Sequence, residues 1–182
     1  MSGTLVVQNL QGPASGANAN KIIVPAGQVL DASAGTFTPS VDQIVQVKTG
    51  TTASQIDTAS TSYVVANLSV TITPKYANSL ILLSVKTSSR WSVDATSTEY
   101  IYATIFRNGT NIGVGSSSSL ALMGAYGAYQ GWAKPFNFGT EDSPNTTSSV
   151  QYTMYLKKYG STSISVHDER FRNIITATEV KQ

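Results

Sequence analysis

The sequence predicts an all-β protein: an antiparallel β-sandwich of jelly-roll type, preceded by a short N-terminal extended arm and hairpin. Ser and Thr make up 46 of the 182 residues, which suits the exposed faces of strands and suits helices poorly. From residue 41 onward, short apolar runs alternate with polar residues at period two. Long stretches of strong helix formers are absent. Regularly spaced short strands of this kind are typical of sandwiches and jelly rolls.

Residues 1–40 lack the regular alternation of residues 41–182, which we expect to form the sandwich domain. The stretch "NKIIVPAGQVLDASAGTF" places Pro25 and Gly27 between two short apolar runs, and this predicts a small hairpin. An isolated two-stranded hairpin is marginal in water, so its apolar side chains need a further partner. A second apolar run, at residues 5–7, is apolar enough to add a strand to the exposed edge of another chain.

Within residues 41–182 the alternation assigns faces to individual strands. Residues 68–72 alternate with one wet face, whereas the continuous apolar run 80–85 predicts a strand buried on both sides. Asn108-Gly109 predicts a type I′ hairpin after the strand 100–106. Residues 150–157 and 164–166 are expected to form a second hairpin. The side chains expected to be mostly buried are Leu68, Val70, Ile72, Leu80, Leu82, Ile105, Tyr152, Met154 and Leu156.

Composition excludes several classes of function. The chain has 12 Lys and Arg against 10 Asp and Glu, and the only adjacent basic pair is Lys157-Lys158, so no nucleic-acid partner is expected. The lack of cysteine excludes disulfides and thiolate metal sites. The first residues lack the pattern of a signal peptide, and no apolar run approaches the ~20 residues of a membrane helix. We therefore expect synthesis in the cytoplasm without membrane insertion.

The sequence gives no sign of catalysis. His167 is the only histidine, and neighbouring residues on a strand point to opposite faces, so it cannot pair directly with Asp168. We therefore interpret His167 as an ordinary loop histidine. The carboxylates are scattered and match no calcium-loop spacing. We expect no enzyme, no cofactor and no metal.

One aromatic stretch, residues 123–136, has two interpretations. Tyr126, Tyr129 and Trp132 lie among small residues and would suit a stacking platform for sugar rings or a protein hot spot. Alternatively, alternate positions belong to the core and the glycines permit tight strand bends. The second interpretation is favoured, but the three aromatic residues stay candidates for surface recognition.

The segments "NKIIVPAGQVLDASAGTFTP", "IVQVKTGTT" and "STSYVVANLSVTITPKYANSLILLSVK" resemble a trimeric β-sandwich module of tailed-bacteriophage virion proteins. Ile105-Phe106-Arg107-Asn108-Gly109 and Asp142-Ser143-Pro144 match two further pieces of its pattern. The resemblance covers roughly residues 20–180. Such modules occur at the ends of tail fibres and on capsid surfaces.

The resemblance implies a homotrimer in the virion, assembled in the host cytoplasm. Around the trimer axis, three copies of the hairpin would together bury apolar side chains that a single copy leaves exposed, namely Ile22, Ile23, Val24, Val29 and Leu30. Leu5, Val6 and Val7 would attach the trimer to the major capsid protein or another virion protein. The implied function is capsid decoration, as a cement protein that stabilises the shell. A tail-fibre or receptor-binding tip that recognises a host-surface glycan or protein is the alternative, and a glycan-active enzyme a remote one.

Overall fold

The chain divides into two compact units, Met1–Thr38 and Pro39–Gln182. The computed structural model describes residues 13–17, 22–24, 26–28, 40–91, 99–115, 117–125, 133–160, 163–167, 170 and 172–182. None of these residues is helical, and all strands among them belong to the second unit. The roles expected for residues 1–40, an arm and a trimerisation hairpin, stay predictions.

The strands of the second unit, in chain order, are β1 (Ile44–Thr52), β2 (Ile56–Thr58), β3 (Val64–Ile72), β4 (Leu80–Trp91), β5 (Glu99–Arg107), β6 (Thr110–Asn111), β7 (Ala121–Ala125), β8 (Lys134–Asp142), β9 (Val150–Tyr159), β10 (Ile164–Val166) and β11 (Asn173–Val180).

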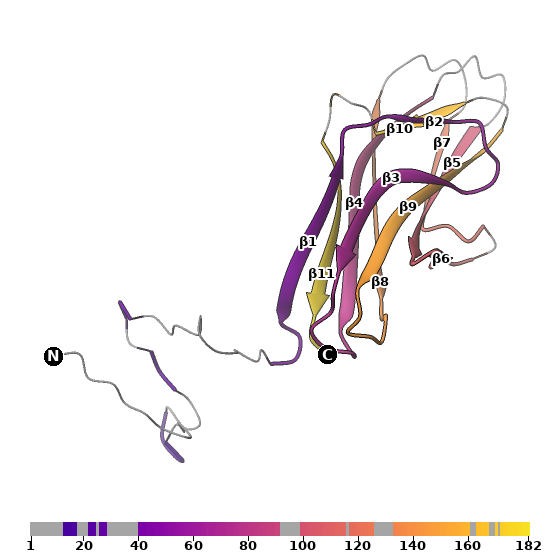
Figure 1. Cartoon of the computed structure of the whole chain (residues 1–182). Coiled ribbons are helices and arrows are strands. Elements are labelled where there is room, and N and C mark those ends of the chain that lie inside the picture. The colour runs from indigo at the N-terminus through magenta and orange to yellow at the C-terminus, as the bar shows by residue number, and fades with distance from the viewer. Residues whose placement is uncertain are drawn as a thin grey trace. The chain divides into compact units, whose positions relative to one another are not determined.

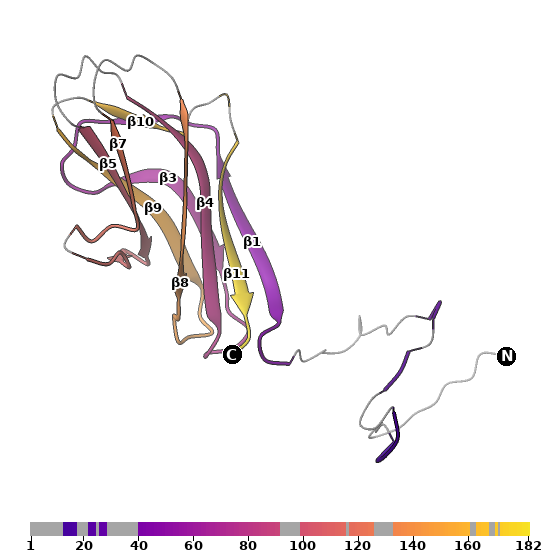
Figure 2. The same cartoon turned by 180° about the vertical axis from the view of Figure 1, so that it is seen from behind.

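These strands form two antiparallel sheets that pack face to face (Figures 1 and 2). Sheet A has the order β1-β11-β4-β10-β2, and β8 pairs with the other edge of β4. Sheet B has the order β3-β9-β5, and both β6 and β7 pair with the free edge of β5. All pairings are antiparallel, as the sequence predicted.

The connectivity is that of a jelly roll. Leaving out the short strands β2, β6 and β10, one sheet reads β1-β11-β4-β8 and the other β3-β9-β5-β7. Among these eight strands only β5 is followed along the chain by a strand of its own sheet, β7; every other strand before β11 is followed by a strand of the opposite sheet. Two interlocked Greek keys give this pattern. The predicted fold class is therefore confirmed.

The core lies between the sheets and follows the predicted alternation on β3, β5 and β9. The strand β4 departs from the prediction, because Leu82 is 42% exposed and Leu80 is only half-buried. Ile81, Leu83 and Val85 point into the core instead. Among the described residues of the second unit, sheet A packs against sheet B through one face, so a strand that is apolar at successive positions still exposes one set of side chains.

One predicted hairpin is confirmed and the other is wrong. Asn108 and Gly109 have φ values of 47° and 86°, as a type I′ turn requires, and Arg107 pairs with Thr110. The strand 164–166, however, does not return beside β9. It is β10 of sheet A and pairs with β2 and β4, so the chain crosses between the sheets after Tyr159.

The described residues of the first unit bear on the predicted hairpin only in part. Ile22, Ile23 and Val24 are 51%, 56% and 40% exposed and lie in no strand. Gly27 has a φ of 81°, which fits its predicted place at the exit of a turn. Val29 and Leu30 lie outside the described residues.

Candidate functional site

The outer face of sheet B carries a cluster of aromatic side chains. They come from β5, from β9 and from the residue that precedes β3, and we call them the tyrosine face: Tyr63, Tyr100, Tyr102, Phe106, Tyr155 and Tyr159. The origin of the face is the strand alternation. Ile101, Ala103 and Ile105 point into the core, so the residues between them point outward.

The rings contact one another across the strands. Phe106 stacks on Tyr155 with ring centroids 3.9 Å apart, and Tyr63 meets Phe106 edge-on at 6.1 Å. Tyr100 lies 5.9 Å from Tyr159 and 6.2 Å from Tyr102. Such aromatic pairs contribute about 0.5–1.5 kcal/mol each beyond their buried area.

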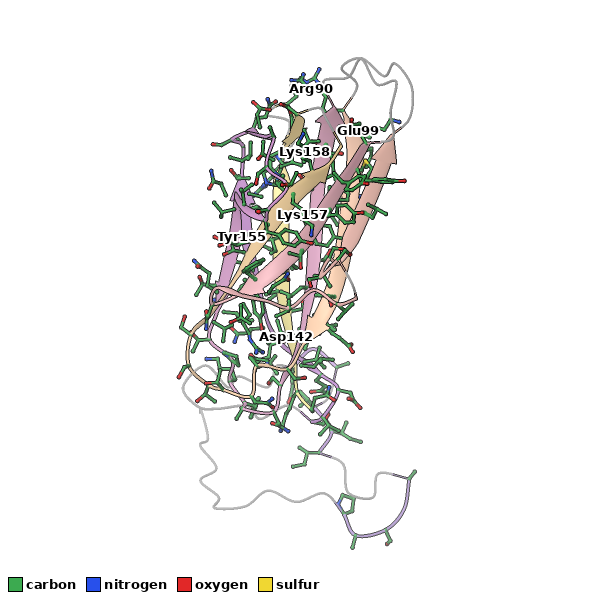
Figure 3. The ribbon with its side chains drawn as sticks, turned by 90° about the vertical axis from the view of Figure 1, so that its right-hand side faces the viewer. Arg90, Glu99, Asp142, Tyr155, Lys157 and Lys158 are labelled. Atoms are coloured by element: carbon green, nitrogen blue, oxygen red, sulfur yellow. The ribbon has the colours of Figure 1, made fainter. Side chains whose placement is uncertain are left out.

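Half of this face supports a loop. The hydroxyl group of Tyr63 donates to the carbonyl oxygens of Ser117 and Ser118 at 3.1 and 3.0 Å. Lys157 donates to the carbonyl oxygen of Ser117 at 3.2 Å, and its Nζ lies 4.4 Å from the centre of the Tyr63 ring. The side chains of Tyr155 and Lys157 can be followed in Figure 3. These contacts hold Ser117 and Ser118, which precede β7, over the sheet, so this half is structural.

The other half is open. Tyr159 is 61% exposed, and beside it Tyr100 and Tyr102 are half-buried. Gly124 pairs with Tyr100, and a Cβ atom at Gly124 would lie 3.0 Å from the Tyr100 ring, so the glycine leaves room for that ring. Of the residues in β3, β5, β7 and β9, only Glu99 is a carboxylate, and it is fully buried. On these strands the open half thus offers rings and hydroxyl groups with no exposed carboxylate, which suits contact with a sugar or a protein surface.

His167 lies in the bend directly after β10, where the sequence predicted a loop histidine, and its contacts give it a structural role. It is fully buried at the end of β10. Its Nε2 lies 2.6 Å from the carbonyl oxygen of Ala66, and its Nδ1 lies 2.8 Å from Oγ1 of Thr87. Burial lowers the pKa of His167 to about 4, although the bond to Ala66 acts to raise it. A neutral imidazole therefore links sheet A to sheet B.

Two further polar groups are also structural. The buried carboxylate of Glu179 accepts hydrogen bonds from the backbone of Lys75 and from the hydroxyl group of Ser79, at 2.7 and 2.6 Å. Asp142 accepts from Arg107 at 3.0 Å and from the hydroxyl group of Tyr152 at 2.7 Å. Among the described residues, no three His, Cys, Asp or Glu side chains gather as a metal site. No helix in the described part of the chain is long and apolar enough to cross a membrane.

The structure does not reach most of the predicted site residues. Leu5, Val6 and Val7 lie outside the described residues, as do Tyr126, Tyr129 and Trp132. Residues 126–132 connect β7 to β8, and β7 carries Gly124 beside the open half of the tyrosine face. The tyrosine face itself was not predicted as a site. Its signal was in the sequence, as Tyr100, Tyr102 and Phe106 at the phase opposite to the buried isoleucines.

Comparison with known proteins gives a weak structural likeness alone. No family model matches the chain, and no curated protein does. A structure of infectious bursal disease virus Gt strain matches at 17% identity and a TM-score of 0.39, over 87% of this chain and 42% of that one. A VP2 subviral particle of the same virus matches at 15% identity and 0.40, over 93% and 45%.

T=1 particles derived from this virus match at 16% identity and a TM-score of 0.41, over 87% of this chain and 40% of that one. The chain thus spans less than half the length of these solved structures. The neighbours are virus-particle structures, and with TM-scores below 0.5 the likeness says nothing about what this chain does.

Proposed function

We propose that the chain is a non-enzymatic structural protein on the exterior of a bacteriophage virion, where it forms a trimeric decoration or cement protein that stabilises the capsid. One observation carries the proposal. Ile22, Ile23 and Val24 expose 51%, 56% and 40% of their surface in a unit that has no strand among its described residues. Three adjacent exposed apolar side chains gain stability when other chains cover them.

Three copies supply the missing partner. Full burial of an Ile or Val side chain contributes about 1.5–3 kcal/mol, so nine half-exposed side chains together contribute on the order of 10 kcal/mol. Association costs roughly 4–15 kcal/mol in lost freedom, and trimerisation therefore needs further contacts from the rest of the hairpin or from the sandwich. The resemblance to trimeric phage modules, carried by the segment that contains these residues, supports this number of copies.

The oligomeric state tests the trimer. Sedimentation velocity of the full chain should give a trimer for the natural sequence and a monomer for the triple variant Ile22→Ser, Ile23→Ser, Val24→Ser. The matched control is Val114→Ser, which removes a side chain that is 72% exposed in the sandwich, and it should stay trimeric. A monomeric natural protein would refute the proposed assembly.

A tail-fibre tip is the second candidate, and the open half of the tyrosine face favours it. Solvent-facing Tyr side chains on strands that carry no exposed carboxylate suit the recognition of a host-surface glycan or protein. A decoration protein binds capsids that lack it and makes them more resistant to heat, whereas a receptor-binding tip binds host cells.

Fluorescently labelled protein, incubated with stripped capsids and with host cells, separates the two candidates. Binding to capsids that is lost on deletion of residues 1–19 supports decoration and the predicted role of Leu5, Val6 and Val7. Binding to cells that is lost in Tyr159→Ser supports the fibre tip. Binding to neither contradicts both candidates.

A further inference from the structure

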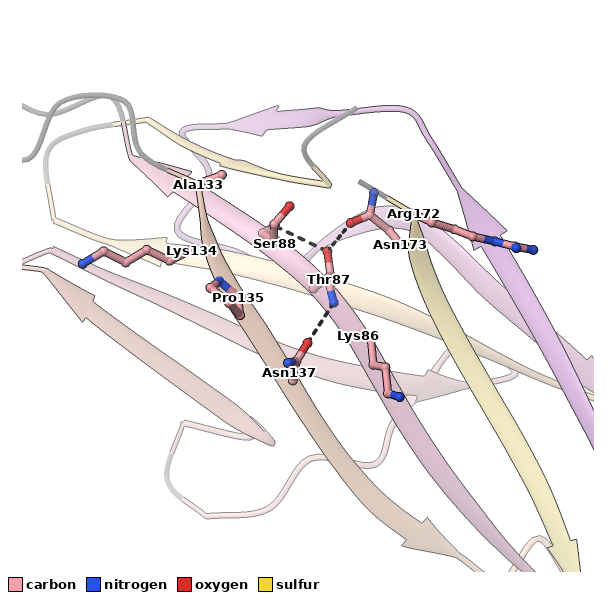
Figure 4. A pocket seen from close by; sticks show the side chains of 9 residues that line it. All are labelled: Lys86, Thr87, Ser88, Ala133, Lys134, Pro135, Asn137, Arg172 and Asn173. Atoms are coloured by element: carbon pink, nitrogen blue, oxygen red, sulfur yellow. Dashed lines mark hydrogen bonds between the residues drawn. The ribbon is translucent and has the colours of Figure 1, made fainter. Parts of the chain in front are cut away.

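A small hollow opens on sheet A where β4 changes its neighbour. The pairing of β4 with β11 ends at Lys86, and its pairing with β10 begins at Ser89. Thr87 and Ser88, which lie between, pair only with β8. The break leaves a cavity with a volume of about 190 Å³ (Figure 4).

The floor of the hollow is polar and fixed in place. Thr87 donates its backbone N–H to Oδ1 of Asn137 at 3.2 Å and its hydroxyl group to Oδ1 of Asn173 at 2.9 Å. Asn173, which is fully buried, also donates to the carbonyl oxygen of Thr52 at 3.3 Å. Asn137, by contrast, is an exposed residue and presents an amide group that can bond to a ligand.

Three cations from three different segments surround this floor. Lys86 comes from β4, Lys134 begins β8, and Arg172 directly precedes β11. In Figure 4 the chains of Lys134 and Arg172 extend to opposite sides of the hollow. Their charged ends therefore suit a ligand that fills the hollow and continues past its rim better than a single small ion.

No described carboxylate lines the hollow, and among the residues of β4, β8 and β11 the carboxylate nearest to Lys86 in register is Glu141, which pairs with Leu82. Four residues at ~3.3 Å each place it about 13 Å away along the strand. That exceeds the screening length of about 8 Å at physiological salt, so no carboxylate of these three strands offsets the charge of Lys86.

We propose that this hollow binds an acidic saccharide: one sugar ring occupies the cavity against Thr87 and Asn137, and carboxylate groups of the chain contact Lys86 and Arg172. Hydroxyl and amide groups recognise sugar hydroxyls, while Lys and Arg recognise carboxylates. The site holds whether the protein decorates a capsid or forms a fibre tip, because it depends only on the sandwich.

Isothermal titration of the full chain at 20 mM and 150 mM NaCl tests the site, with a galacturonic acid hexamer as ligand and maltohexaose as its neutral counterpart. The acidic hexamer should bind, more weakly at the higher salt, and maltohexaose should bind at least tenfold more weakly. Inorganic phosphate should also bind at least tenfold more weakly than the hexamer, because it cannot span the rim. Equal affinity for the neutral and acidic hexamers, or no binding of the acidic one, would overturn the proposal.

Variants locate the site. Lys86→Ala and Arg172→Ala should each weaken binding of the acidic hexamer by about fivefold, the effect of one exposed ion pair of about 1 kcal/mol. Both side chains are exposed, so neither change disturbs the core. The matched control is Lys48→Ala, an exposed lysine on β1 of the same sheet, which should change the affinity by less than about twofold. A loss in Lys48→Ala equal to that in Lys86→Ala would place binding elsewhere and refute the site.

Discussion

Protonation of His167 should destabilise the sandwich, and the size of the effect follows from its surroundings. In the folded protein the imidazole is fully buried, its Nε2 lies 2.6 Å from the carbonyl oxygen of Ala66, and its Nδ1 lies 2.8 Å from Oγ1 of Thr87. These surroundings favour the neutral ring, because burial away from water penalises the charged imidazolium. Burial accordingly lowers the pKa of His167 from 6.5 to about 4.

The direction in which stability changes with pH follows from the linkage between proton binding and folding. The unfolded chain, with the higher His pKa, binds the proton more readily, so the free energy of unfolding falls as the pH falls from 6.5 towards 4. The full difference of about 2.5 pKa units corresponds to roughly 3.4 kcal/mol at 1.36 kcal/mol per unit. Between pH 7.5 and pH 5 the expected loss is about 2 kcal/mol. Because His167 is the only histidine and ordinary carboxyl groups titrate mostly below pH 5, this window reports on it with little interference.

Urea unfolding at pH 7.5, 6 and 5, followed by circular dichroism at one protein concentration, measures the effect. The variant His167→Asn is the control, since Asn tolerates the φ of 63° at this position and does not titrate. The natural protein should lose about 2 kcal/mol over the range, and the variant should lose much less. A natural protein whose stability is flat from pH 7.5 to 5, or a variant with the same slope, would refute the reasoning.

Three further substitutions test contacts of the sandwich by urea unfolding at pH 7.5. Gly50→Ala should destabilise by several kcal/mol or prevent folding, because its Cβ would lie 1.7 Å from the carbonyl oxygen of Ser69. The control is Gly115→Ala, where a Cβ meets no atom within 4 Å and the only cost is the backbone strain of a φ of 76°. Glu179→Ala should cost about 3 kcal/mol or more, since it leaves buried donors without an acceptor, and Glu179→Gln should cost less; equal costs would contradict this account. Tyr152→Phe should lower the free energy of unfolding by about 1–2 kcal/mol, because it removes the hydrogen bond to Asp142. If Tyr152→Phe costs nothing in the natural background but does cost stability in the Asp142→Asn background, the assigned pair is contradicted.

The features predicted correctly from the sequence are local ones. Period-two alternation assigns the buried faces of β3, β5 and β9 because each pattern lies within a single strand. The turn at Asn108-Gly109 was predictable because it needs only two residues that adopt positive φ. The run 80–85 did not show which residues face the core, since apolar residues occupy both alternating positions. Leu82 is exposed because it lies on the outer face of sheet A.

The pairing of strands far apart in the chain could not be predicted from the sequence. The residues 150–166 carry two strand patterns around a turn signal, which equally describe a hairpin and a crossover between two sheets. The choice depends on β2 and β4, which pair with β10 from more than 70 residues earlier in the chain. The burial of His167 is hidden for the same reason. Its neighbours Asp168 and Glu169 suggest an exposed loop, while its partner Ala66 lies 101 residues away.

His167 also supplies a backbone donor at the point where β4 changes neighbours. Its N–H donates to the carbonyl oxygen of Ser88 at 3.0 Å, at the point where neither β11 nor β10 pairs with β4. Its ring meanwhile reaches Ala66, inside the irregular stretch of β3 between Val65 and Ser69. His167 thus gives a hydrogen-bond donor to one carbonyl group at each of two interrupted ladders, and a break in a ladder is stable only where its polar groups find other partners. The same break forms the floor of the proposed saccharide site, so that site depends on an internal residue that never contacts the ligand.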